Sequence, residues 1–115
     1  MGFPAFSSDL VRSSADLVLL ALLAEEPMHG YQLLTSLGEK GSGDFRLAQG
    51  TLYPLLYRLE REGWVGARWE TPPRGKRRKV YSLTAAGRKE LQRQRAEWTR
   101  FTAAIRSILE ECDRA

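Results

Sequence analysis

The spacing of hydrophobic residues predicts two helices at the start of the chain. Residues 9–26 form a segment whose second half is apolar on nearly every side, which is typical of a helix buried all round. Pro27 marks the end of this helix. A second, short helix is expected from residue 29 to about Leu37, with Gly38 as its stop signal.

A third helix is predicted over residues 49–62, because its leucines repeat with helical spacing. They fall at positions i, i+3, i+4 and i+7, which places all of them on one face. Gly63 is the expected C-terminal stop of this helix. The leucines of this face are Leu52, Leu55, Leu56 and Leu59.

Beyond residue 63 the hydrophobic period changes from that of a helix to that of a strand. Residues 64–71 and 79–83 alternate well enough for two strands, and residues 72–75 between them have the composition of a turn. These segments predict a β-hairpin. Thr84 is then a suitable N-cap for a long final helix that extends to about Cys112.

The final helix carries a regularly spaced row of apolar residues. Spacings of 7, 3, 4, 3 and 4 residues describe a heptad seam, the pattern of a helix that pairs with another helix. Because the short helices are used in the core, either the first helix or a second protomer must cover this seam. The row consists of Leu91, Trp98, Phe101, Ile105, Ile108 and Cys112.

The order of these elements predicts a mainly α fold with a small β-hairpin. Two short helices, joined by a tight connection and followed by a hairpin, have the layout of a winged helix-turn-helix. We expect a flexible N-terminal arm over residues 1–8, a winged helix-turn-helix domain over residues 9–83, and a C-terminal dimerisation helix over residues 84–115.

The distribution of charge adds a functional indication to this layout. The net charge is +4, but residues 58–79 carry eight basic and three acidic groups, whereas residues 1–57 carry three basic and six acidic groups. A positive charge concentrated in so short a segment is a candidate footprint for a polyanion. A solvated basic loop is the alternative reading of charge alone.

Residue counts and hydropathy exclude several kinds of site. The single Cys112 cannot form a disulfide within the chain, and together with the single His29 it cannot supply the four ligands of a structural zinc site. The longest apolar run, residues 17–24, is far shorter than the roughly 20 residues that a membrane span needs. Because the start of the chain also lacks a convincing secretory signal, we expect a cytoplasmic protein. No signature predicts an enzyme, a catalytic residue, a metal site or a cofactor, and His29 has the position of a capping or packing residue.

Three segments resemble the PadR family of transcriptional regulators. PMHGYQL at residues 27–33 resembles the start of that family's second helix, and GTLYPLLYRLEREG at residues 50–63 resembles its recognition helix. RRKVYSLTAAG at residues 77–87 resembles its second wing strand and the start of its last helix. The resemblance spans about residues 14–110 and is closest to the compact branch with a single C-terminal dimerisation helix. It implies a homodimeric regulator of the repressor type, often responsive to small molecules.

The third helix is the predicted recognition helix, and its side opposite the leucines is the candidate DNA surface. The N-terminal half of such a helix meets base edges in the major groove. Gly50 would allow close approach to a phosphate, and Pro54 is tolerated if the helix begins close to Gly50. Arg58 and Arg61 are expected to contact the DNA backbone, unless they pair with neighbours on the helix such as Glu62. We place Gln49, Thr51, Tyr53 and Tyr57 near the groove, with packing of either tyrosine under the wing as the alternative.

The turn of the hairpin is the second candidate DNA contact. Five of six consecutive residues are basic, and a loop with this charge is expected to bind the phosphate backbone, with one arginine possible in the minor groove. A loop that only increases solubility is the alternative. The residues are Arg74, Lys76, Arg77, Arg78 and Lys79.

The seam of the final helix is the candidate site of assembly and regulation. The resemblance implies that a tryptophan here, Trp98 with Phe101 beside it, faces a pore between protomers and stacks on a small apolar or aromatic effector. Packing in the dimer core is the alternative. We expect dimerisation through Leu91, Trp98, Phe101, Ile105 and Ile108.

The sequence therefore predicts a homodimeric, sequence-specific DNA-binding repressor that recognises a pseudo-palindromic operator in double-stranded DNA and is released by an effector. Two other hypotheses stay open. A winged helix can serve as a protein-interaction module without sequence-specific DNA binding, and a basic domain can bind DNA of any sequence. The steep salt dependence of phosphate contacts distinguishes the first alternative, and a preference for one operator distinguishes the second.

Overall fold

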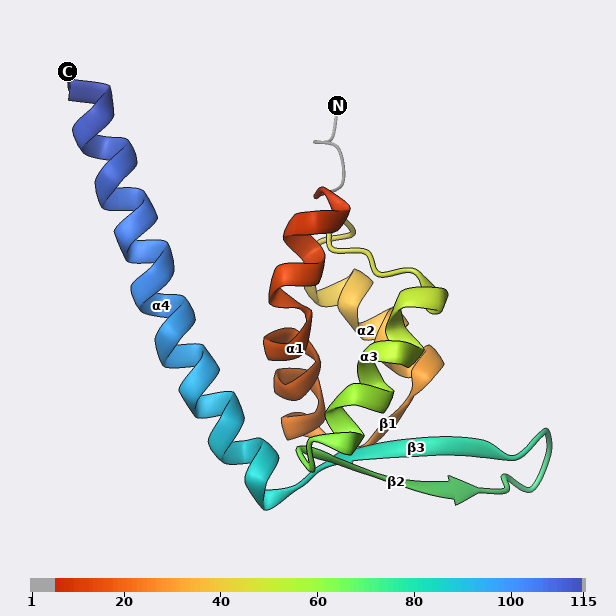
Figure 1. The fold of residues 1–115 in the computed structure, drawn as a ribbon. Coiled ribbons are helices and arrows are strands. Elements are labelled where there is room, and N and C mark those ends of the chain that lie inside the picture. The colour runs from red at the N-terminus through yellow and green to blue at the C-terminus, as the bar shows by residue number, and fades with distance from the viewer. Residues whose placement is uncertain (1–5, 115) are drawn as a thin grey trace.

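The computed structural model describes residues 6–114, which form four helices and a three-stranded antiparallel sheet (Figure 1). This architecture confirms the predicted mainly α fold with a small β-hairpin. The helices are α1 (Ser8–Glu25), α2 (Gly30–Lys40), α3 (Gln49–Arg61) and α4 (Ala85–Arg114). The strands are β1 (Met28–His29), β2 (Val65–Glu70) and β3 (Arg78–Leu83).

The third strand of the sheet is an element that the hydrophobic pattern did not predict. The strand order is β1-β3-β2, and Met28 and His29 pair with Tyr81 and Val80. A strand of two residues is too short to show an alternating pattern, so its pairing is set by tertiary structure. Its effect is to attach the start of α2 to the hairpin.

The predicted N-terminal arm lies largely outside the described residues, which begin at Phe6. Helix α1 begins at Ser8, inside the predicted arm. The side chain of Ser7 accepts a hydrogen bond from the backbone N–H of Leu10 at 3.3 Å. This is an N-cap, which satisfies one of the free donors of the first turn. The backbone N–H of Phe6 donates to the carbonyl oxygen of Asp44 at 3.2 Å.

The expected end of α2 at Gly38 was wrong. The helix continues through Gly38 to Lys40, and the backbone N–H of Gly41 donates to the carbonyl oxygen of Leu37 at 2.9 Å. A glycine inside a helix costs only about 1 kcal/mol relative to alanine, and the burial of the helix face offsets this cost. Gly41, not Gly38, is the C-cap residue.

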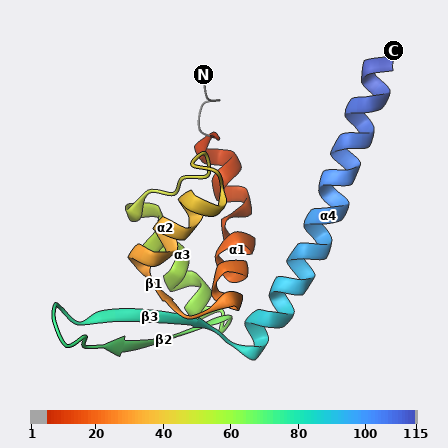
Figure 2. The same ribbon diagram turned by 180° about the vertical axis from the view of Figure 1, so that it is seen from behind.

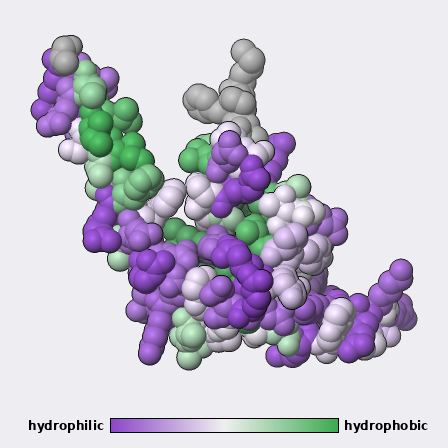
Figure 3. Space-filling model, in the orientation of Figure 1, coloured by the Kyte–Doolittle hydropathy of each residue, from purple (hydrophilic) through white to green (hydrophobic). Residues whose placement is uncertain are grey.

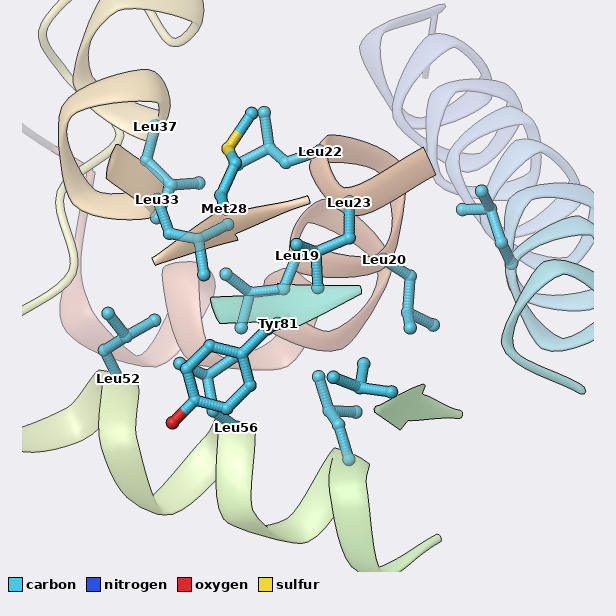
Figure 4. Close-up of a cluster of buried hydrophobic side chains, with 13 residues drawn as sticks. Leu19, Leu20, Leu22, Leu23, Met28, Leu33, Leu37, Leu52, Leu56 and Tyr81 are labelled. Atoms are coloured by element: carbon cyan, nitrogen blue, oxygen red, sulfur yellow. The ribbon is translucent and has the colours of Figure 1, made fainter. Parts of the chain in front are cut away.

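The core lies where α1, α2 and α3 meet the sheet, and Figure 4 shows its side chains pointing toward one another. Leu52, Leu56 and Leu59 of the predicted leucine face are fully buried, and Leu55 is partly buried. Because one side of α3 is used in this way, the opposite side is left to the solvent. The core also contains Leu19, Leu20, Leu22, Leu23, Met28, Leu33, Leu37, Val65, Tyr81 and Leu91.

The long helix α4 leaves the domain at the end of β3 and diverges from α1 (Figures 1 and 2). Its first turn confirms the predicted cap, since the hydroxyl of Thr84 accepts the backbone N–H of Gly87 at 3.0 Å. Leu91 belongs to the core of its own domain, so α1 and the sheet cover the first part of the seam. Farther along, Phe101, Ile105 and Ile108 are exposed in this single chain.

Candidate DNA-binding surface

The exposed side of α3 carries the residues that the sequence assigned to the DNA surface. Tyr53 is 43% exposed and Tyr57 is 65% exposed. Gln49, Gly50 and Arg61 are also exposed, and Thr51 is half-buried. The structure therefore brings Gln49, Gly50, Tyr53, Tyr57 and Arg61 to the exposed side of α3, whereas Thr51 lines a separate hollow beside the start of α1.

The N-terminus of α3 is open to an outside acceptor. The helix begins at Gln49, and its N-cap residue is Ala48, whose side chain accepts no hydrogen bond. Pro54 lies in the second turn, where its missing N–H leaves the carbonyl of Gly50 without its usual partner in the helix. The start of α3 at Gln49 confirms the prediction that the helix begins close to Gly50. Backbone N–H groups at such an end, together with the helix dipole, favour an anion.

A groove of about 480 Å³ separates α3 and the start of α2 from the hairpin. One wall is the ring of Tyr53, which packs against Gly30 at the first position of α2. The opposite wall contains cationic side chains of the hairpin. The lining residues are His29, Gly30, Tyr31, Tyr53, Trp69, Arg77, Arg78, Lys79 and Tyr81.

The hairpin presents three of the predicted basic residues at its turn and two at the start of β3, and Figure 3 shows this projection as a hydrophilic arm. Arg74, Lys76, Arg77 and Arg78 are exposed. Lys79 differs from the others, because its ammonium group lies 3.1 Å from a carboxylate oxygen of Glu60, and this hydrogen bond raises the pKa of Lys79. Four of the five predicted wing cations thus lie fully on the surface, and the fifth is tied to α3.

Trp69 is a residue of this surface that the sequence analysis did not single out. It is 55% exposed on β2, and the guanidinium carbon of Arg77 lies 4.8 Å from the centre of its ring. This cation–π contact holds Arg77 over the ring at the groove. The only signal in the sequence was a large aromatic residue within a predicted strand beside a basic turn.

Arg58 and Arg61, which the sequence assigned together to the DNA backbone, have different surroundings. Arg61 is exposed near the end of α3. A guanidinium nitrogen of Arg58 donates a hydrogen bond to a carboxylate oxygen of Asp16 on α1, and this contact raises the pKa of Arg58. Arg58 is thus held by an ion pair, but its partner lies 42 residues away on α1 and is not the neighbour on the same helix that the sequence suggested.

His29 is the N-cap residue of α2, as its position in the sequence indicated. Its Nδ1 accepts the backbone N–H of Gln32 at 3.3 Å, and its own backbone N–H donates to the side-chain oxygen of Gln32 at 3.0 Å. This capping box requires a neutral imidazole. Partial burial lowers the pKa of His29, and the positive charge of Arg78 lowers it further.

A second hollow, of about 710 Å³, lies between α1 and α4 and contains the candidate effector residues. The ring centres of Trp98 and Phe101 are 6.0 Å apart, and the ring planes are tilted by 39°. Carboxylates from both helices, Asp16 and Glu97, line the same cleft. The structure thus brings the predicted aromatic pair together in the cleft between α1 and α4. Figure 3 shows that the side of α4 facing α1 is largely hydrophobic.

The helical core, the outward face of α3 and the basic hairpin define a winged helix-turn-helix DNA-binding regulator. The chain belongs to the PadR-like family of transcriptional regulators, whose family model matches residues 19–93. A transcriptional regulator of Mycobacterium tuberculosis is 36% identical over 84 residues, which cover 73% of this chain and 75% of that protein.

Solved structures of bacterial regulators have the same fold. A PadR family transcriptional regulator from Eggerthella lenta is 32% identical, with a TM-score of 0.80 over 89% of this chain and 87% of that one. A transcriptional regulator from Clostridium thermocellum is 27% identical, with a TM-score of 0.81 over 90% of this chain and 97% of that one. Within residues 6–114, no helix combines the length and apolarity that crossing a membrane requires.

Proposed function

We propose that this protein is a homodimeric repressor that binds a pseudo-palindromic operator in double-stranded DNA and is released by a small apolar or aromatic effector. The observation that carries the proposal is the placement of two exposed tyrosines of α3, Tyr53 and Tyr57, beside the basic hairpin. Aromatic hydroxyls and cations on neighbouring parts of one surface suit a polyanion with readable base edges. We place this activity in the cytoplasm.

In this proposal α3 enters the major groove and the hairpin follows the adjacent backbone. Gln49, Thr51, Tyr53 and Tyr57 lie at or near the N-terminal half of α3, which is the part that reaches bases in a helix-turn-helix. The open N-terminus at Gly50 receives a phosphate. Phosphate contacts supply most of the affinity and the groove contacts supply the specificity. The backbone contacts are Arg61, Arg74, Lys76, Arg77, Arg78 and Lys79.

The second half of α4 is the proposed dimer contact. Phe101 is 56% exposed, Ile105 42% and Ile108 59%, and they recur with heptad spacing along one side of the helix. An exposed apolar row of this length is typical of a surface that a partner covers. A two-fold dimer then presents two copies of α3 to successive turns of the major groove, about 34 Å apart.

The cleft between α1 and α4 is the proposed effector site. Trp98 is half-buried and Phe101 is beside it, so a flat ligand can stack on an aromatic surface that the dimer partly encloses. A ligand that prefers the dimer arrangement with a poor fit to the operator shifts the population toward that arrangement. Release from DNA follows because the effector binds this arrangement more tightly than it binds the arrangement that fits the operator.

Selection of bound fragments from randomised duplex DNA tests the proposal, followed by titration of the selected fragment at several salt concentrations. Wild type is compared with Tyr57→Ala, which removes an exposed side chain, and with Gln92→Ala on the exposed surface of α4 as control. We expect a palindromic motif, a steep salt slope, and a loss of about tenfold or more for Tyr57→Ala only. Absence of a motif, with weak binding that Tyr57→Ala leaves unchanged, would overturn the proposal in favour of a protein partner.

A further inference from the structure

An ion pair joins the recognition helix to α1. Arg58 of α3 and Asp16 of α1 form this pair, and their side chains are 39% and 25% exposed. Partial removal from water strengthens such a pair relative to one on the open surface. Because Asp16 neutralises Arg58 within the protein, Arg58 has little free charge with which to displace a counterion from DNA.

Helix α1 lies between α3 and α4, as both views of the fold show (Figures 1 and 2). Asp16 also lines the cleft between α1 and α4, as do Glu97 and Trp98 of α4. The same carboxylate therefore stands at the boundary between the DNA-reading helix and the helix that we assign to dimerisation. Any rotation of α3 against α1 must stretch or break the contact between Asp16 and Arg58.

We propose that Arg58 is a positioning residue that fixes the orientation of α3, and with it the spacing between half-sites that the dimer accepts. This inference rests on the proposed function. The chain of contacts runs from α3 through Arg58 and Asp16 to α1, and from α1 to α4 and the second protomer. Arg58 makes no phosphate contact in this arrangement.

The geometry makes half-site spacing sensitive to this single pair. The 13 residues of α3 give a rod of about 20 Å. From Arg58 to the start of α3 at Gln49 this rod measures about 14 Å, so a tilt of about 10° about Arg58 moves the N-terminus of α3 by about 2 Å, a large part of the rise of one base pair. Loosening the pair between Asp16 and Arg58 thus widens the range of orientations that α3 can take, and with it the tolerance of the dimer for an altered half-site spacing.

A double-mutant cycle tests the inference in the full chain. Wild type, Asp16→Asn, Arg58→Gln and the double variant are titrated with the selected operator at several salt concentrations. They are also titrated with operators that have one base pair added or removed at the centre. Unfolding in urea is measured for all four, so that the contribution of the pair to the fold is known independently of DNA.

We expect both single variants to weaken operator binding by about three- to tenfold and the double variant to be no weaker than either. The salt slope should stay at the wild-type value, and the penalty for altered spacing should shrink in all three variants. The inference is overturned if Arg58→Gln lowers the salt slope by about one while Asp16→Asn, which frees Arg58, strengthens binding. It is also overturned if the two effects add, or if altered spacing is penalised as in wild type.

Failure of the proposed function has a different signature. In that case wild type selects no operator, and the four proteins bind DNA equally weakly. The inference about half-site spacing is then overturned together with the proposed function. Coupled losses of stability in urea would still show that the pair of Asp16 and Arg58 holds α3 on α1.

Discussion

Tyr53 packs so closely against Gly30 that the glycine has no room for a side chain. A Cβ atom at Gly30 would lie 2.5 Å from the hydroxyl oxygen of Tyr53 and 2.9 Å from its Cζ. The first residue of α2 therefore determines where the tyrosine of α3 stands, at the wall of the groove beside the hairpin. Tyr53, a residue of the candidate DNA-binding surface, is thus positioned by the absence of a methyl group at Gly30.

Gly30→Ala should lower operator affinity with little effect on the fold. The added methyl group pushes away only the far end of the Tyr53 side chain, so we expect the free energy of unfolding to change by less than about 1 kcal/mol. Displacement of Tyr53 should weaken binding to the selected operator by about tenfold. Titration and urea unfolding measure the two effects. Gly30→Ala in a Tyr53→Ala background is the control, and a further loss there would show that Gly30 acts through another residue.

Gly50→Ala tests whether DNA approaches the backbone at the start of α3. A Cβ atom at Gly50 would have no protein atom within 4 Å, and the residue is helical, so stability should rise by up to about 1 kcal/mol. If a phosphate lies against Gly50, the same methyl group should reduce affinity for any duplex by several-fold. Gly38→Ala in α2, which is equally open, is the matched control for helix stabilisation without DNA contact. Unchanged DNA binding of Gly50→Ala would place the phosphate elsewhere.

Gly87→Ala should destabilise the domain where α4 leaves it. A Cβ atom at Gly87 would lie 2.0 Å from the carbonyl oxygen of Trp64, which is backbone and cannot move without shifting the turn before β2. We expect a loss of about 2–3 kcal/mol or more in the free energy of unfolding. Gly38→Ala, with open space, should gain stability in the same urea experiment. Equal stability of Gly87→Ala and wild type would mean that the start of α4 is free to move away from Trp64.

Acidification should destabilise the protein through His29. The folded state lowers the pKa of His29, through burial and the charge of Arg78, although Glu70 opposes this shift. The unfolded chain therefore binds a proton more readily, so the stability that His29 contributes is present above its ordinary pKa of about 6.5 and is lost as the pH falls through the lowered pKa. A protonated Nδ1 cannot accept the N–H of Gln32, and the lost cap costs about 1 kcal/mol.

Urea unfolding between pH 7.5 and 5 measures this effect, above the range in which most carboxylates titrate. His29→Asn is the matched control, because asparagine caps a helix without titrating and should flatten the pH dependence. The same slope in His29→Asn as in wild type would assign the pH dependence to other groups.

The regular patterns of the sequence predicted most of the fold. The leucine spacing of residues 52–59 fixed which side of α3 faces the core, and it therefore also fixed the exposed tyrosines. The caps at His29 and Thr84 depend on contacts three residues apart, so local sequence was enough to predict them.

What the sequence did not predict depends on contacts between distant residues. Strand β1 pairs with a strand about 50 residues later, and Arg58 finds Asp16 across 42 residues. No periodic pattern in the sequence predicts either contact. Trp69 and Arg77 meet only because β2 and β3 are brought side by side at the hairpin. These contacts follow from the packing of the folded chain, and they determine which candidate DNA contacts are free and which are held by the protein itself.

Ile105→Glu should separate dimer formation from folding. Ile105 is 42% exposed in the single chain and no part of the core, so the domain should fold as in wild type. In the proposed dimer the new carboxylate is buried without a partner, which should raise the dimer dissociation constant by at least about 100-fold. Sedimentation equilibrium measures this constant, and urea unfolding checks the fold. A monomer contacts one half-site only, so affinity for the full operator should fall while affinity for an isolated half-site is kept.

The matched control for this variant is Ser107→Glu, which adds the same charge at an exposed position between Ile105 and Ile108, off the heptad row. It should leave the dimer intact, because its side chain points away from the seam. A dimer that tolerates Ile105→Glu as well as Ser107→Glu would show that this face of α4 is not the interface. The cleft beside Trp98 would then have to close against α1 of the same chain.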